Sequence, residues 1–188
     1  MHRFLIFSLV FFLVFPMNAV TFDELCEKLT AHRVTSGTFL QEKTAKALKK
    51  PLLSSGTFRI DENGIEWRTE KPFKSTMKVN KTELIQISAD GKTTKMDGSS
   101  NAVFMSVADT ISAIFLGNKD ALNTNFAVDF ADEGETWHLQ LEPKDATIKS
   151  ALSTIEMWGN PDSDTFDRVK VTQASGDTIL YTFANQTH

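Results

Sequence analysis

The feature that most constrains the fold is a hairpin predicted within residues 51–72. Two stretches of alternating apolar and polar residues flank a polar turn that ends in Asn63-Gly64. Asn-Gly is a strong hairpin signal because both residues tolerate the positive φ that a twisted turn requires. In the second strand Ile65 and Trp67 alternate with charged residues and therefore share one face. A tryptophan on a strand has to be covered, either by the protein's own core or by a bound ligand.

The first 19 residues have the pattern of a secretory signal peptide. A short positive start precedes an apolar run at residues 4–15, and the small residue Ala19 follows. This run is too short to cross a bilayer, which favours a signal peptide over an uncleaved membrane anchor. We therefore predict a signal peptide at residues 1–19, cleaved near Ala19, and a single exported domain at residues 20–188.

Charge and cysteine content argue against nucleic-acid binding and against an internal disulfide. The formal net charge of −4 provides no basic footprint of the kind that nucleic-acid binding requires, so we expect no nucleic-acid partner. Cys26 is the only cysteine and cannot form an internal disulfide. Its helical spacing from Phe22 and Leu29 predicts a small buried residue, with a reactive thiol as the alternative.

Short strands joined by turns make up most of the domain. Thr21 and Glu24 form a capping box that predicts a helix ending near residues 31–33. Five strands then follow up to residue 87, linked by short turns as in an antiparallel meander. The predicted strands of the second half of the chain cover residues 126–130, 136–142, 152–158, 166–173 and 178–183.

A second helix is predicted over residues 104–116. Phe104, Val107 and Ile111 recur at helical spacing, and Gly117 provides the stop signal. Asp109 is the only charged residue of this helix, although a helix on a solvated surface normally carries many charges opposite its apolar stripe. Two interpretations stay open: an ordinary buried core helix, or a helix that lies over an apolar space.

The stretch at residues 43–50 carries four lysines and no acid. A run of this kind is either a solvated loop or a surface that contacts anionic lipid head groups or an acidic partner.

No pattern of residues typical of catalysis or metal binding occurs in the sequence. The three histidines outside the signal, His32, His138 and His188, are far apart, and none has a second ligand four residues away. There is no Gly-x-Ser-x-Gly elbow and no phosphate-binding glycine loop. We predict no catalytic residues, no metal and no cofactor. Three tryptophans and the ten phenylalanines outside the predicted signal peptide favour the binding of an apolar ligand, with an enzyme as an alternative.

Several motifs, taken in order, resemble the LolA-type outer-membrane lipoprotein carriers of Gram-negative bacteria. They are Gly37-Thr38-Phe39-Leu40-Gln41, Ser55-Gly56-Thr57-Phe58, residues 64–72 with Trp67 and Pro72, and residues 176–185. The resemblance implies an α+β, mostly β fold: an incomplete, half-open antiparallel β-barrel with helices covering the concave face. It places an apolar cavity for acyl chains between the sheet and a lid helix at residues 104–116.

The same resemblance implies a periplasmic carrier that is not an enzyme. Such a carrier receives a lipoprotein or another lipid from an inner-membrane exporter, of the ABC type or another, and passes it to an outer-membrane acceptor. We expect it to be a monomer. The well-studied carriers have an Arg-Pro pair that helps to clamp the lid, where this chain has Asp61-Glu62. The sequence looks more like a divergent branch associated with glycolipid or aryl-polyene-type lipids, so the cargo stays open.

Strand alternation and helical spacing predict ten residues that line the cavity. They are Phe39, Phe58, Trp67, Met77, Trp137 and Tyr181 on the strands, and Phe104, Val107, Ile111 and Phe115 on the lid helix. A register error of one residue would move the whole set of a strand to the opposite face. Two other classes of function remain as alternatives: a lipid-sensing regulatory domain of the cell envelope with the same fold, and a β domain without a ligand.

Overall fold

The computed structural model describes residues 19–31, 34–80, 82–97 and 102–187, with the side chains of residues 102–108 left out. The predicted signal peptide therefore lies outside the described residues, except for Ala19. Within the described part of the chain, no helix combines the length and apolarity needed to span a membrane.

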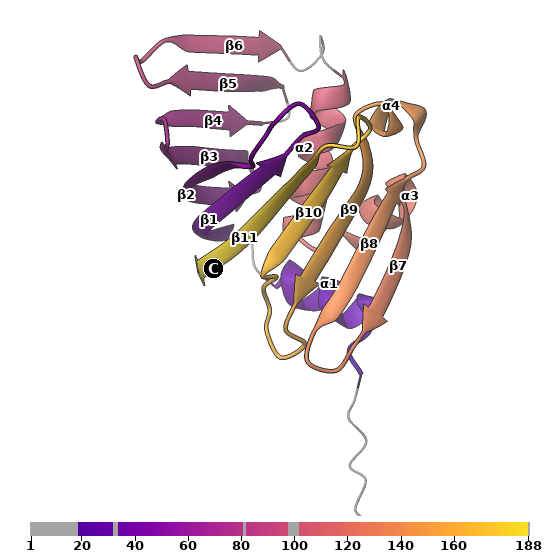
Figure 1. Cartoon of the computed structure of the whole chain (residues 1–188). Coiled ribbons are helices and arrows are strands. Elements are labelled where there is room, and N and C mark those ends of the chain that lie inside the picture. Colours follow the sequence, from indigo (N-terminus) through magenta and orange to yellow (C-terminus); the bar gives the residue numbers. More distant parts are fainter. Residues whose placement is uncertain (1–18, 32–33, 81, 98–101, 188) are drawn as a thin grey trace, which may run out of the picture.

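Eleven strands form one antiparallel sheet that curves but does not close (Figure 1). The strands follow the order β6-β5-β4-β3-β2-β1-β11-β10-β9-β8-β7, and β6 and β7 are its two edges. They are β1 (Val34–Thr44), β2 (Leu52–Asp61), β3 (Gly64–Lys71), β4 (Ser75–Val79), β5 (Glu83–Ser88), β6 (Thr93–Asp97), β7 (Phe126–Asp132), β8 (Trp137–Pro143), β9 (Leu152–Gly159), β10 (Arg168–Gln173) and β11 (Thr178–Thr187). The predicted mostly β, half-open antiparallel barrel is confirmed.

Four helices lie on the concave side of this sheet (Figure 1). They are α1 (Phe22–Thr30), α2 (Ala102–Phe115), α3 (Lys119–Asn125) and α4 (Ala146–Lys149). Helix α2 contacts β2 and β3 in one half of the sheet, and it also contacts α3 and α4. The predicted lid helix is thus present and covers the concave face.

The capping box of α1 is formed as predicted. The Glu24 N–H donates to the Thr21 hydroxyl, and the Thr21 N–H donates to the Glu24 carboxylate at 2.8 Å. These bonds favour the ionised carboxylate and lower the pKa of Glu24. The helix buries Cys26, and this burial raises the pKa of the thiol to about 11. Cys26 is therefore a small buried residue that stays protonated at neutral pH.

The hairpin of β2 and β3 also forms as predicted. Asp61 lies opposite Gly64, and the Asn63 N–H donates to the Asp61 carboxylate at 2.8 Å. Trp67 lies between Phe58 of β2 and Met77 of β4, so the three side chains share the concave face.

Several elements differ from the sequence prediction. Strand β6 was not predicted, because all five of its residues are exposed and carry no apolar alternation. Helix α3 was not predicted either, although the Asn118 side chain caps it by accepting from the Ala121 N–H at 3.1 Å. Strand β1 begins at Val34, and β11 continues to Thr187, four residues beyond its predicted end at residue 183.

An aromatic cluster fills the space between the end of α2 and the sheet. Phe115 of α2 lies 4.5 Å from Phe166 and 5.5 Å from Phe58, measured between ring centroids. Phe183 of β11 lies 5.6 Å from Phe115 and 5.1 Å from Phe58. This cluster fixes the C-terminal end of α2 against the strands in the middle of the sheet.

Gly117 should be essential for the packing of α2 against α1. Its φ of +59° is left-handed, and a Cβ there would lie 2.4 Å from the Cys26 carbonyl oxygen. Gly117→Ala should lower the free energy of unfolding by about 3 kcal/mol or more, because backbone strain adds to the displacement of α1. The matched control is Gly91→Ala, whose φ is +80° with nothing within 4 Å of the added Cβ, and it should cost about 1 kcal/mol. Urea denaturation of both variants measures the difference, and equal losses would contradict the packing described for Gly117.

Candidate functional site

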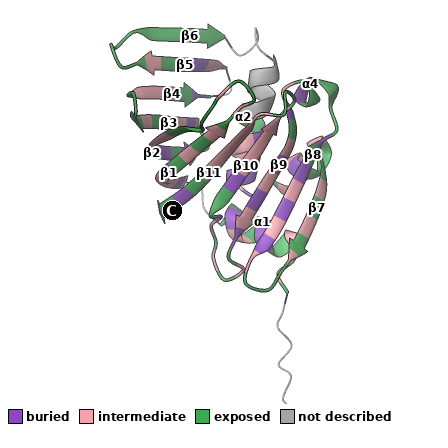
Figure 2. Ribbon diagram, in the orientation of Figure 1, coloured by how far each residue is buried: buried purple, intermediate pink, exposed green. Residues whose placement is uncertain are grey.

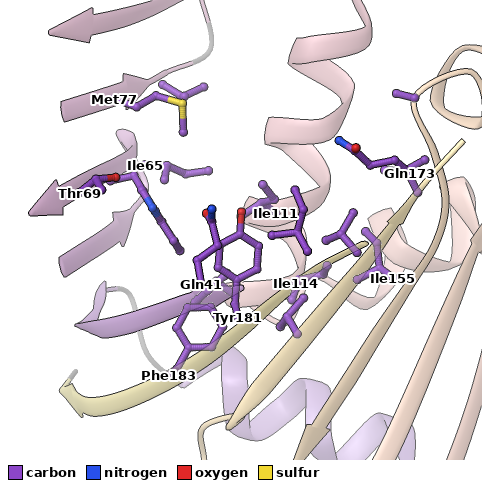
Figure 3. A pocket seen from close by; sticks show the side chains of 18 of the residues that line it. Gln41, Ile65, Thr69, Met77, Ile111, Ile114, Ile155, Gln173, Tyr181 and Phe183 are labelled. Atoms are coloured by element: carbon purple, nitrogen blue, oxygen red, sulfur yellow. The ribbon is translucent and has the colours of Figure 1, made fainter. Parts of the chain in front are cut away.

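A cavity of about 400 Å³ lies between the concave face of the sheet and α2 (Figure 3). This volume falls within the range of about 300–1,000 Å³ that is typical of ligand sites. Its walls come from both halves of the sheet and from α2, so the cavity exists only because the sheet curves. The lining residues are Gln41, Ile65, Trp67, Thr69, Ser75, Met77, Val79, Gln86, Ile111, Ile114, Phe115, Ala151, Leu152, Ile155, Val169, Val171, Gln173, Ile179, Tyr181 and Phe183.

The lining contains no charged side chain among the described residues. Most of its members are aliphatic or aromatic, and the polar minority consists of glutamine, serine, threonine and one tyrosine. Transfer of an ionised group into such surroundings costs several kcal/mol unless a partner compensates the charge. The cavity is therefore suited to an uncharged, mainly apolar portion of a ligand.

Trp67 forms part of the cavity wall and is packed from behind by other aromatic rings. The Phe39 ring centroid lies 4.1 Å from that of Trp67, and the Phe58 centroid lies 5.8 Å away. Tyr181 meets Trp67 edge-on at 5.3 Å. The cover that this tryptophan requires thus comes from the core on one side, while the other side borders the cavity.

Two polar side chains stand out in this apolar lining. Figure 3 shows Gln41 of β1 and Tyr181 of β11 close together among the side chains that line the cavity. Burial raises the pKa of the Tyr181 hydroxyl to about 12, so it is a neutral donor at physiological pH. Within the described part of the chain, neither side chain makes a hydrogen bond. Both groups are available to a polar group of a ligand.

The structure brings five of the ten predicted site residues to the cavity. They are Trp67, Met77, Ile111, Phe115 and Tyr181. Phe39 and Phe58 lie behind Trp67 and are buried. Trp137 is fully buried against Phe130 of β7 and lies outside the lining. The side chains of Phe104 and Val107 lie outside the described residues. That these residues bind a lipid stays a prediction.

Sequence reasoning predicted only Tyr181 from the part of the cavity wall that β9, β10 and β11 provide. Ile155, Val169, Val171 and Ile179 line the cavity but read in sequence as ordinary core residues. A signal was present in β10, where two valines alternate with Arg168 and Lys170 and so mark an apolar inner face. What the sequence could not supply is the curvature that brings this face opposite Trp67.

Asp61, at the position where the resemblance would place the clamping Arg-Pro pair, forms an ion pair with Arg59. The Arg59 Nε lies 3.3 Å from the Asp61 carboxylate on the surface of the β2–β3 hairpin. Glu66, on the same hairpin, accepts from Lys78 at 2.9 Å, and that lysine lowers the pKa of Glu66. These charges lie on the opposite face of β3 from Trp67 and do not line the cavity. Among the described residues, no group of three or more histidine, cysteine, aspartate or glutamate side chains could hold a metal ion.

A family model described as outer membrane lipoprotein carrier protein LolA matches residues 31–188. The chain belongs to this family. A comparison with curated protein sequences finds no match. Among solved structures, the chain is similar to a LolA superfamily protein from Nitrosomonas europaea, with 11% identity, coverage of 90% of this chain and 94% of that one, and a TM-score of 0.45.

Two further solved structures are similar to this LolA-family chain. A putative outer membrane lipoprotein-sorting protein domain from Vibrio parahaemolyticus has 8% identity, coverage of 88% and 91%, and a TM-score of 0.43. MucB in complex with MucA(peri) has 13% identity, coverage of 87% and 52%, and a TM-score of 0.38. Because these TM-scores are below 0.5, the family assignment rests on the family model.

Tyr181 gives a direct test of how the cavity is closed to water, because it is the only tyrosine of the chain. Its phenol should titrate near pH 12, above its ordinary pKa of 10.0, when ultraviolet absorbance of the phenolate is followed. Above pH 10 the unfolded chain releases this proton while the folded chain keeps it, so stability is lost as the pH rises through the folded pKa. Tyr181→Phe should lack that part of the loss, and a midpoint near pH 10 in the folded protein would contradict the burial.

Proposed function

We propose that this protein is an exported carrier that holds the acyl chains of a lipoprotein or another lipid in the cavity beneath α2. The observation that carries the proposal is the uncharged lining of a 400 Å³ cavity within a LolA-family fold. An acyl chain gains about 0.8 kcal/mol for each CH₂ group removed from water. A cavity of this kind therefore replaces the contacts that the chain leaves behind in the membrane.

The polar side chains of the lining suggest how the ligand is oriented. An ester or amide carbonyl at the head of an acyl chain needs a hydrogen-bond donor when it leaves water. The Tyr181 hydroxyl and the Gln41 amide provide such donors without a formal charge. We infer that acyl chains enter the apolar part of the cavity while a charged head group stays outside.

The C-terminal end of α2 is the fixed part of the helix in this proposal. Phe115 packs in the aromatic cluster and also lines the cavity, and Ile111, one turn earlier, borders the cavity as well. Movement of α2 about the fixed end would open the cavity without dismantling the core. A carrier needs such movement because it has to release what it binds.

The remaining parts of the proposal concern location and partners. We propose that the protein acts in the periplasm as a monomer, without a cofactor and without catalysis. Its cargo would come from an inner-membrane exporter, of the ABC type or another, and would leave to an outer-membrane acceptor. Lipoprotein and other lipids remain alternative cargoes, because Asp61-Glu62 stands where better-known carriers have Arg-Pro.

Filling part of the cavity should slow transport but leave the fold intact. In Ile111→Trp the larger ring occupies space that about two CH₂ groups would use, so transfer of acylated cargo between donor and acceptor vesicles should fall about tenfold. Asp109→Trp, at an exposed position of the same helix, is the matched control and should transfer as the parent does. Equal rates for the two variants would contradict the cavity as the binding site. A parent that binds the cargo but transfers none would instead favour the regulatory, lipid-sensing alternative.

A further inference from the structure

Large hydrophobic side chains are exposed at one end of the β1–β2–β3 segment. The exposed fractions are 79% for Phe73, 66% for Leu53, 64% for Leu40 and 55% for Leu52. Within the described residues, the only other large hydrophobic side chain in this class is Met96 of β6, at 39%. Scattered exposed leucines need no explanation, but a group at one place indicates a contact surface.

Strand register places Leu40 and Leu53 on one face of the sheet, whereas Leu52, opposite Lys43, lies on the other face near the same ends of β1 and β2. Ser55 pairs with Lys71 across an irregularity in the β2–β3 register, and it pairs with Leu40 in the regular β1–β2 register, so Leu40 and Ser55 share one face. Leu53 lies opposite Glu42 on that same face, two residues from Ser55. This face is convex, because the intervening Gln41 points into the cavity. Phe73 follows Lys71 in the turn between β3 and β4, and Figure 2 shows both this turn and the β1–β2 connection as exposed.

Several lysines lie close in sequence to the exposed hydrophobic residues. Residues 43–50 carry four lysines and no acid, and residues 70–74 add two lysines and one glutamate. The whole chain, by contrast, has a net charge of −4. We call this surface the basic rim: Leu40, Leu52, Leu53 and Phe73, with Lys43, Lys46, Lys49, Lys50, Lys71 and Lys74.

The loop that carries most of these lysines is held against the neighbouring turn. The Lys46 N–H donates to the Asp177 carboxylate at 3.3 Å, and the Leu48 N–H donates to the Ala45 carbonyl at 2.9 Å. The lysine ammonium groups are therefore presented on a folded loop.

The basic rim borders one end of the cavity. Three polar residues of the lining, Gln41, Thr69 and Ser75, each lie two residues along the chain from Lys43, Lys71 and Phe73 respectively. A surface that contacts the basic rim therefore lies next to these three polar residues of the cavity lining.

We propose that the basic rim docks the protein on the surface of an anionic lipid bilayer. Phe73 and the leucines enter the boundary between head groups and acyl chains, and the lysines contact the anionic head groups. A second copy of the chain fits this surface poorly, because a two-fold interface would bring the same lysines together. This docking goes beyond the carrier function, since it requires neither cargo nor an opened cavity.

Co-sedimentation with vesicles tests the docking directly. The full chain is expressed in a Gram-negative host, and its exported form is mixed with vesicles of phosphatidylcholine, with or without phosphatidylglycerol. The protein should bind only the vesicles that contain phosphatidylglycerol, and high salt should release it. Phe73→Ser should weaken this binding about tenfold. Lys49→Ser and Lys50→Ser should weaken it about fivefold each.

Matched control variants come from β6, at the far edge of the sheet, and from Lys92 in the turn that precedes it. Met96→Ser removes an exposed hydrophobic side chain there, and Lys92→Ser and Lys95→Ser remove exposed charges. These variants should bind vesicles as the parent does.

The proposal is overturned if the parent binds neither vesicle type, or if the control variants lose as much binding as those of the basic rim. It is also overturned if light scattering shows a dimer that Phe73→Ser converts to a monomer, because the surface would then be a self-interface. Cargo transfer is measured separately, so failure of docking leaves the carrier function untouched.

Discussion

The structure depends on covering the apolar concave face of an open sheet. A sheet that does not close cannot bury this face by itself, and the four helices provide the cover. Helix α2 carries out most of this task over β2 and β3, which explains why its sequence shows a single charge between Ala102 and Phe115. The hairpin that carries Trp67 and helix α2, with its single charge, therefore have to be explained together, because the helix covers the apolar face of the hairpin.

The cover is tight at one end and incomplete at the other. Around Phe115 the rings of Phe58, Phe166 and Phe183 fill the space completely enough to leave all four side chains buried. Next to this cluster, Trp67, Tyr181 and Ile111 are only half buried, and the cavity lies between them. A fully packed interior would have gained stability from the same residues, so the space that is left favours a ligand over a purely structural role.

Local signals in the sequence predicted most of the elements. The capping box at Thr21, the Asn63-Gly64 turn and the stop at Gly117 act over a few residues, and each appears in the structure. Strand alternation also predicted that Trp137 points inward, and this side chain is buried. Trp137 does not line the cavity, although it was predicted to do so. The reason is that β8 lies three strands from β11, in a part of the sheet where Phe130 packs against Trp137. Which inward-facing residues border a cavity depends on the curvature of the whole sheet, and no local pattern encodes that curvature. The contribution of Val169 and Val171 was missed for the same reason.

The central claim is that the space beneath α2 holds acyl chains. Native mass spectrometry of protein isolated from cells without detergent tests it most directly. The account predicts a noncovalent adduct with the mass of an acylated molecule on the parent protein, and its loss in Ile111→Trp. A parent protein that is free of ligand in every preparation, or an adduct that survives unchanged in Ile111→Trp, would contradict it.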